Sequence, residues 1–166
     1  METIETARLR LVPVRVEHAD EMAGVLADPA LHSYIGGAPD DVATLRARYR
    51  RWAAGSPDQA VTWGNWVIES RADRCLVGTV QATITGASAE VAWVVGTRWQ
   101  GQGIATEAAR GLFEWLRSRE VLAVLAHVHP DNAASAAVAG ALGLRATGER
   151  QDGEVRWRWA ADDDRA

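Results

Sequence analysis

Two glycines one residue apart stand just before a helix-like pattern in the segment RWQGQGIATEAA, residues 98–109. Gly101 and Gly103 lack a Cβ, so the backbone can turn sharply there and a ligand can approach it closely. The first N–H groups of the helix that follows have no partner within the helix and point outward. Together, the loop and the helix start predict a backbone cradle for an anion, most often a phosphate group.

The remaining segments predict a mixed sheet flanked by helices. Runs rich in β-branched and aromatic residues predict strands, at residues 8–14, 60–70, 76–85, 89–95 and 121–128. Apolar residues with helical spacing predict helices, at residues 17–28, 41–55 and 104–119, with a fourth helix opening after Pro130. Asp152-Gly153, between two strand-like runs, predicts a terminal hairpin over 144–160. We therefore expect a single α+β domain over residues 1–160 and a disordered acidic tail over 161–166.

The composition narrows the class of protein. A chain of 166 residues suits one domain, and its net charge of −4 argues against general nucleic-acid binding. No apolar run approaches the roughly 18–20 residues of a membrane helix, and the N-terminus shows no signal-peptide pattern. We therefore expect a cytoplasmic protein without a membrane partner. The single cysteine, Cys75, excludes an internal disulfide framework.

Two common phosphate-binding loops do not fit the glycine segment. A dinucleotide fingerprint needs a third glycine at the position that Thr106 occupies. A Walker loop needs a lysine, and all eighteen basic residues of this chain are arginines. The segment therefore predicts an amide cradle that contacts phosphate without a lysine.

Two motifs in this order resemble those of a known family. Gln100-Gly101-Gln102-Gly103-Ile104-Ala105, directly after the strand EVAWVV, resembles the Q/R-x-x-G-x-G/A motif of the GNAT N-acetyltransferase superfamily. The segment HPDNAASAAVAGALGLRATGE resembles the N-x-x-S-x-x-V…LGL-x-x-x-G segment of its Rim-type branch, the ribosomal-protein acetyltransferases and their relatives. The resemblance covers about residues 6–160. It implies the GNAT fold, a largely antiparallel mixed sheet of six to seven strands, splayed at its centre and flanked by about four helices.

The resemblance also implies acetyl-CoA as the co-substrate. It assigns the pyrophosphate to the amides of the glycine loop, and the pantetheine arm to the gap between the strands 90–95 and 121–128. Asn132 is expected either as a plain N-cap, in competition with Asp131, or as a cap that also contacts the cofactor. The residues implied for the cofactor are Trp93, Val94, Val95, Gln100, Gly101, Gln102, Gly103, Ile104, Ala105, Thr106, Asn132 and Ser135.

Two side chains are candidates for acid–base chemistry. Glu90 starts the strand that would carry the thioester, where a carboxylate can accept the amine proton; the alternative is a solvated glutamate at a strand edge. Many relatives carry a tyrosine acid in the last helix, but this chain has Ala139 there, which leaves Ser135 as the candidate acid. The alternative for Ser135 is a small residue that lets coenzyme A approach. A backbone N–H near Val94 is the expected oxyanion donor.

No sequence motif identifies the acceptor site, and only individual residues can be suggested for it. His32, Tyr34, Trp66 and His127 are candidate contacts for the acceptor. His127 and His129 share a strand face, but no further ligand set accompanies them, so we expect no metal.

The sequence thus predicts an acetyl-CoA-dependent N-acetyltransferase that transfers the acetyl group directly, in a ternary complex, to a primary amine. We expect a peptide α-amine or a small amphipathic amine, and a monomer or homodimer. At pH 7 an α-amine needs only about 1–1.4 kcal/mol to become neutral, whereas a lysine ε-amine needs about 4.6 kcal/mol. The alternative is a GNAT-like module that binds acyl-CoA as a sensor or scaffold without turnover.

Overall fold

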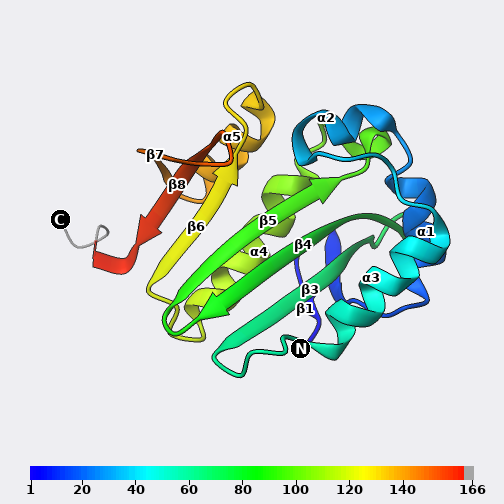
Figure 1. Ribbon diagram of the computed structural model, residues 1–166, viewed down its shortest axis with the longest axis horizontal. Coiled ribbons are helices and arrows are strands. Elements are labelled where there is room, and N and C mark those ends of the chain that lie inside the picture. The colour runs from blue at the N-terminus through cyan, green and yellow to red at the C-terminus, as the bar shows by residue number, and fades with distance from the viewer. Residues whose placement is uncertain (163–166) are drawn as a thin grey trace.

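The computed structural model describes residues 1–162, which form an eight-stranded sheet with helices packed on it (Figure 1). The strands lie in the order β1-β2-β3-β4-β5-β6-β8-β7. They are β1 (Ile4–Glu5), β2 (Leu9–Pro13), β3 (Val61–Ser70), β4 (Cys75–Thr85), β5 (Ser88–Val95), β6 (Ala123–Val128), β7 (Arg145–Gln151) and β8 (Glu154–Ala160). The helices are α1 (His18–Val25), α2 (His32–Ile35), α3 (Val42–Ala54), α4 (Ile104–Arg117) and α5 (Ala133–Ala141), with short 3₁₀ turns η1 (Pro29–Leu31) and η2 (Thr97–Trp99).

The predicted α+β fold is confirmed, with one more strand and one more helix than expected. β1 has two residues and α2 is a single turn, so neither is long enough to show a periodic pattern. α1 ends at Val25 rather than at residue 28. Asp28 instead caps η1, because its Oδ1 accepts a hydrogen bond from the Ala30 N–H at 2.9 Å. The predicted hairpin is present, and Gln151 pairs with Glu154 across its turn.

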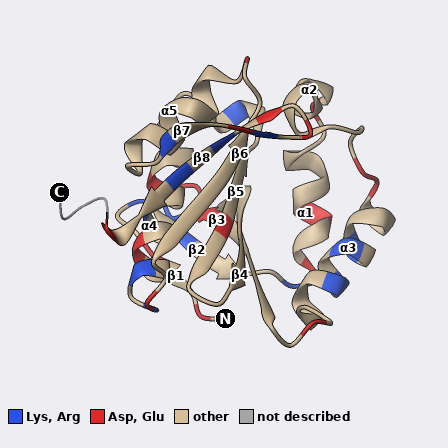
Figure 2. Ribbon diagram, turned by 60° about the vertical axis from the view of Figure 1, so that its left-hand side comes forward, with Lys and Arg blue, Asp and Glu red and all other residues tan. Residues whose placement is uncertain are grey.

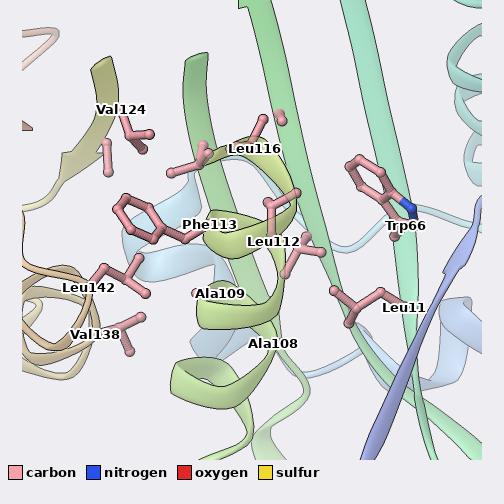
Figure 3. Close-up of a cluster of buried hydrophobic side chains, with 14 of the residues drawn as sticks. Leu11, Trp66, Ala108, Ala109, Leu112, Phe113, Leu116, Val124, Val138 and Leu142 are labelled. Atoms are coloured by element: carbon pink, nitrogen blue, oxygen red, sulfur yellow. The ribbon is translucent and has the colours of Figure 1, made fainter. Parts of the chain in front are cut away.

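Helices cover both faces of the sheet (Figure 1). α4 packs on one face through its apolar stripe, which Figure 3 shows against Trp66 and Val124 of the sheet. α1 and α3 pack on the other face, where Met22 and Tyr49 lie against Val67 of β3. The apolar spacing that predicted α4 therefore matches the side of the helix that is buried.

β5 and β6 are the only parallel neighbours in the described sheet, and they separate after a short contact. They pair only from Ser88–Ala123 to Glu90–Leu125. Beyond Glu90 the strands continue to Val95 and Val128, and in Figure 1 they diverge toward α2 and α5. The predicted splay at the centre of the sheet is thus located at residues 91–95 of β5.

The described chain extends two residues past residue 160, the predicted end of the domain. The N–H of Ala161 donates to the Leu122 carbonyl at 2.9 Å, which joins this residue to the fold. The rest of that predicted tail, residues 163–166, lies outside the described residues. Over residues 1–162, no helix has the length and apolar character that crossing a bilayer requires.

Candidate active site

The glycine loop adopts the left-handed backbone that the predicted cradle needs. Gly101 and Gly103 have φ angles of 74° and 77°, which residues with a side chain adopt only at a cost. Gly103 is the N-cap of α4, and its carbonyl accepts a hydrogen bond from the N–H of Glu107 at 3.0 Å. The N–H groups at the start of α4 therefore lack partners within the helix and are donors for an anion.

Arg8, in the bend between β1 and β2, braces this loop. Its Nη1 donates to the Gln102 carbonyl at 3.0 Å and its Nε donates to Oε1 of Glu107 at 2.8 Å. Burial raises the pKa of Glu107, but hydrogen bonds from Arg8 and Thr6, together with the charge of Arg8, outweigh burial and hold that pKa below its ordinary value. The arginine thus compensates a carboxylate that would otherwise oppose an anion at the helix start.

A cavity of about 380 Å³ lies between the glycine loop, β5, α5 and α2. Its lining includes every residue predicted for the cofactor except Gln102. The Gln102 side chain turns away from this cavity, and its Nε2 donates to the Arg98 carbonyl at 3.4 Å. The cradle is therefore a backbone feature at this position, and the amide side chain of Gln102 is not part of the cavity wall.

Beyond Glu90, the backbone of β5 faces the gap that opens between β5 and β6. The N–H of Gly96 donates to the Val77 carbonyl at 2.8 Å. Because ladder bonds alternate along an antiparallel strand, this bond directs the backbone of Val94 toward β4, and that of Trp93 and Val95 toward the gap. The N–H groups that face the gap near Val94 are therefore those of Trp93 and Val95, and not that of Val94 itself.

A second cavity, of about 570 Å³, meets the first one. The two share six lining residues, namely Tyr34, Ile35, Trp93, Val94, Asn132 and Ser135. From this junction the second cavity extends past Glu90 and His127 to Asp40 and Trp52 of the α3 region. Ligands in the two cavities can therefore meet at the junction, which is the arrangement that direct transfer between two substrates needs.

Glu90 lies where β5 leaves β6, and its carboxylate lines the second cavity. The side chain is 52% exposed, and its Oε1 lies 2.9 Å from Nδ1 of His127. His127 is only 8% exposed, and its Nε2 lies 3.2 Å from Nε of Arg156. His127, which we predicted as an acceptor contact, lines the cavity but has both ring nitrogens engaged by side chains of the protein.

Asn132, rather than Asp131, is the N-cap of α5. Its Oδ1 accepts a hydrogen bond from the Ser135 N–H, and its Nδ2 donates to the Ser135 Oγ, both at 3.1 Å. The amide thereby leaves the Ser135 hydroxyl hydrogen for another acceptor. Ala139 is fully buried in the core, whereas Val138 lines the first cavity, so the position that we matched to the family's tyrosine faces away from the cleft.

The other predicted acceptor contacts divide into two groups. His32 and Tyr34 line the second cavity, where α2 reaches across the gap and the Tyr34 ring contacts that of His129 at 5.3 Å. Trp66 is wrong as an acceptor contact, because it is 1% exposed in the core beneath α4 and its Nε1 donates to the Glu2 carbonyl at 2.9 Å. Its ring packs edge-on against Trp115, with centroids 5.1 Å apart.

Asp40, Arg48, Trp52 and Glu154 also line the second cavity, and sequence reasoning missed all four. Asp40 and Arg48 form an ion pair at 2.6 Å between the loop before α3 and the helix itself. No motif surrounds these residues in the sequence, and only the tertiary fold brings them to the cavity that Glu90 also lines.

Cys75 lines neither of the two cavities. Burial and the nearby Asp73 and Glu21 raise the pKa of the Cys75 thiol, so this cysteine is not an activated nucleophile. Within residues 1–162, no group of three or more His, Cys, Asp or Glu side chains is arranged to hold a metal ion.

The comparisons with known proteins agree with this geometry. The sequence profile of the acetyltransferase (GNAT) domain matches residues 8–145. Solved structures with the same fold include an acetyltransferase of the GNAT family from Bacillus anthracis, with a TM-score of 0.81 at 17% identity, covering 97% of this chain and 99% of that one. Another is RimL, a ribosomal-protein alpha-N-acetyltransferase in complex with coenzyme A, with a TM-score of 0.80 at 17% identity and coverage of 97% and 99%.

A third is an acetyltransferase from Agrobacterium tumefaciens, with a TM-score of 0.76 at 24% identity and coverage of 96% and 94%. A comparison with curated proteins by sequence found no match. The structural neighbours thus share the fold at low identity and include the Rim-type branch. Because the family profile spans most of the sequence, the chain belongs to the GNAT acetyltransferase family.

Proposed function

We propose that this protein is an acetyl-CoA-dependent N-acetyltransferase of primary amines. The observation that carries the proposal is the junction of two cavities between the diverging strands, one beside a backbone phosphate cradle and the other beside Glu90. Membership of the GNAT family supports acetyl transfer as the reaction. The fold shared with RimL, which was solved with coenzyme A, supports coenzyme A as the carrier.

The residues of the first cavity fit acetyl-CoA. The amides at the start of α4 would hold the pyrophosphate, and the absence of a Cβ at Gly103 leaves room for close contact. The backbone of Trp93 and Val95 would pair with the pantetheine amides, in the place that a strand would otherwise take. Bound there, acetyl-CoA supplies an acetyl thioester.

Three groups of the protein then serve the transfer. Glu90 accepts the amine proton, directly or through water, and releases it to solvent. The N–H of Trp93 or Val95 stabilises the oxyanion as the new C–N bond forms and the C–S bond breaks. Ser135 Oγ donates a proton to the departing sulfur and regains one from solvent, although a thiolate with a pKa of roughly 8.5 also leaves without much help.

The lining of the second cavity supports an amphipathic, cationic acceptor. Trp52 and Ile35 offer apolar contact, whereas Glu90 and Glu154 offer carboxylates. Asp40 also lines the cavity, but its charge is already paired with Arg48. An α-amine suits this site better than a lysine ε-amine, because neutralising it at pH 7 costs about 1–1.4 kcal/mol rather than about 4.6 kcal/mol. We therefore propose a peptide α-amine or a small amphipathic amine as the acceptor.

An acceptor panel with acetyl-CoA, scored by thiol release, tests the proposal. Peptides with a free α-amine are compared at fixed pH with N-blocked peptides that contain lysine. A higher kcat/KM for the free α-amines supports the assignment, and a preference for the blocked lysine peptides overturns the acceptor class. Tight acetyl-CoA binding without thiol release for any amine would favour the non-catalytic binding module instead.

A further inference from the structure

A row of polar side chains crosses three neighbouring strands on one face of the sheet. His127 on β6 pairs directly with Arg156 on β8, and Glu90 lies on β5 at the other side of β6. The row continues to β7, where Oε2 of Glu149 accepts a hydrogen bond from Nη1 of Arg156 at 2.6 Å. The basic positions of β8 appear in blue in Figure 2. The row thus connects the candidate base with the terminal hairpin.

The donors in this row fix the tautomer of His127. The guanidinium of Arg156 can only donate, so its Nε–H places the Nε2 lone pair of His127 in the role of acceptor. A neutral imidazole then carries its hydrogen on Nδ1, which lies 2.9 Å from Oε1 of Glu90. His127 therefore donates to Glu90, and one carboxylate oxygen remains for the substrate.

We propose that His127 and Arg156 are positioning residues that orient Glu90 as the general base. This inference rests on the proposed function of Glu90. Because the Nε2 lone pair of His127 is committed to Arg156, the ring does not take over the proton that Glu90 receives, and that proton leaves to water at the exposed carboxylate. His127 is thus a fixed donor and not a second base.

The charged groups around His127 come from four directions. Glu90 faces it from β5, Arg156 and Glu154 come from β8, Glu149 lies behind Arg156 on β7, and His129 follows it in the chain. Gln151 accepts a further bond from Nη2 of Arg156 at 3.3 Å. The guanidinium is therefore held from the hairpin side, which keeps its Nε aimed at the ring.

Imidazole NMR of the full chain tests the tautomer without any turnover. The four histidines are resolved by long-range ¹H–¹⁵N correlation at pH 8.5, and His127 is assigned from its absence in His127→Asn. We expect an Nδ1-protonated ring for His127, and a mixture of tautomers in Arg156→Met. An Nε2-protonated ring in the unsubstituted protein would overturn the inference.

Kinetics of matched variants test the positioning role. His127→Leu should lower kcat about tenfold or more with little change in acetyl-CoA affinity. The loss should fall on kcat and leave the KM for acetyl-CoA unchanged, because the ring contacts Glu90 and does not line the first cavity. His127→Asn keeps an N–H donor near the Nδ1 position and should recover most of the rate. A wild-type kcat in His127→Leu, or equal damage in both variants, would refute the role.

Arg156→Met should lower kcat, though less than His127→Leu does, because the ring loses the donor that fixes its tautomer and only part of the population then donates to Glu90. Arg150→Met is the matched control, because Arg150 is an exposed residue next to Glu149 on β7 and so points to the opposite face. An unchanged kcat in Arg156→Met would refute its part in the row. Absence of turnover in the unsubstituted protein would refute the proposed function, while the NMR result would still decide the tautomer.

Discussion

The two connected cavities form one cleft, and its two ends are built from different parts of the chain. The end beside the glycine loop is made of backbone: two left-handed glycines, the N-terminus of α4 and the unpaired edge of β5. The end beyond Glu90 is made of side chains from α2, α3, β4, β5, β6 and β8. Backbone donors serve any molecule that carries the same phosphate group, whereas side chains from many elements set which acceptor fits. Under the proposed function, the glycine-loop end is the cofactor end and the end beyond Glu90 is the acceptor end, so the first can stay constant while the second varies.

The largest effect should come from a charge placed in the backbone cradle. Gly103→Glu introduces a side chain at a φ of 77° and sets a negative charge against phosphate. We expect acetyl-CoA affinity to fall at least about a hundredfold, or about 2.7 kcal/mol, as measured by calorimetry. Gly140→Glu is a control on α5, where an added Cβ meets no atom within 4 Å. Unchanged affinity in Gly103→Glu would remove the loop from the cofactor site.

An effect of similar size should fall on the rate of transfer and leave acetyl-CoA binding unchanged. Glu90→Gln keeps the shape of the side chain but removes the base, so kcat should fall about 10²–10⁴-fold. Acetyl-CoA affinity should stay the same, and the deficit should shrink as pH rises, because more of the amine is then neutral without help. A rate loss that is constant from acid to alkaline pH would count against Glu90 as the base.

Ser135 lies at the junction of both ends and should give a smaller effect. Ser135→Ala removes the Oγ that accepts from Asn132 and leaves the backbone cap bond of Ser135 in place. We expect kcat to fall about tenfold, below the 10²–10⁴-fold range of strong acid–base catalysis, because a thiolate leaves readily. Single-turnover kinetics measure this step. A wild-type kcat would show that water, and not this serine, protonates the leaving group.

The parts of the site that the sequence could predict lie mainly at the glycine-loop end of the cleft, and the parts that it could not predict lie mainly beyond Glu90. The glycine spacing, the strand before it and the helix after it are local features, so the loop residues and the extent of α4 were predictable from the chain alone. Glu90 was predicted from its place on a strand, but its partners were not, because His127 is 37 residues away and Arg156 is 29 residues beyond that. Trp66 was misassigned, since alternation along a strand separates two faces without saying which one faces the core.

The smallest predicted effect concerns the brace between Arg8 and the cradle. The pKa of Glu107 is lowered in the folded state from an ordinary value of 4.5, so its contribution to stability is present above that value. The contribution is lost as the pH falls through the lower pKa of the folded state. Glu107→Gln should therefore be less stable than the unsubstituted protein at pH 7, with a difference that shrinks below about pH 4.

We expect that difference to stay near or below about 1 kcal/mol, because Arg8 is half exposed and a glutamine oxygen still accepts from Thr6 and Arg8. Urea unfolding at pH 7 and pH 3.5 measures it, and Glu114→Gln, an exposed change further along α4, is the matched control. Acetyl-CoA affinity should change only a few-fold, because the cradle donors belong to the backbone of residues 103–106 and the brace holds them from outside. A loss of affinity as large as that of Gly103→Glu would instead place Arg8 or Glu107 in direct contact with the cofactor.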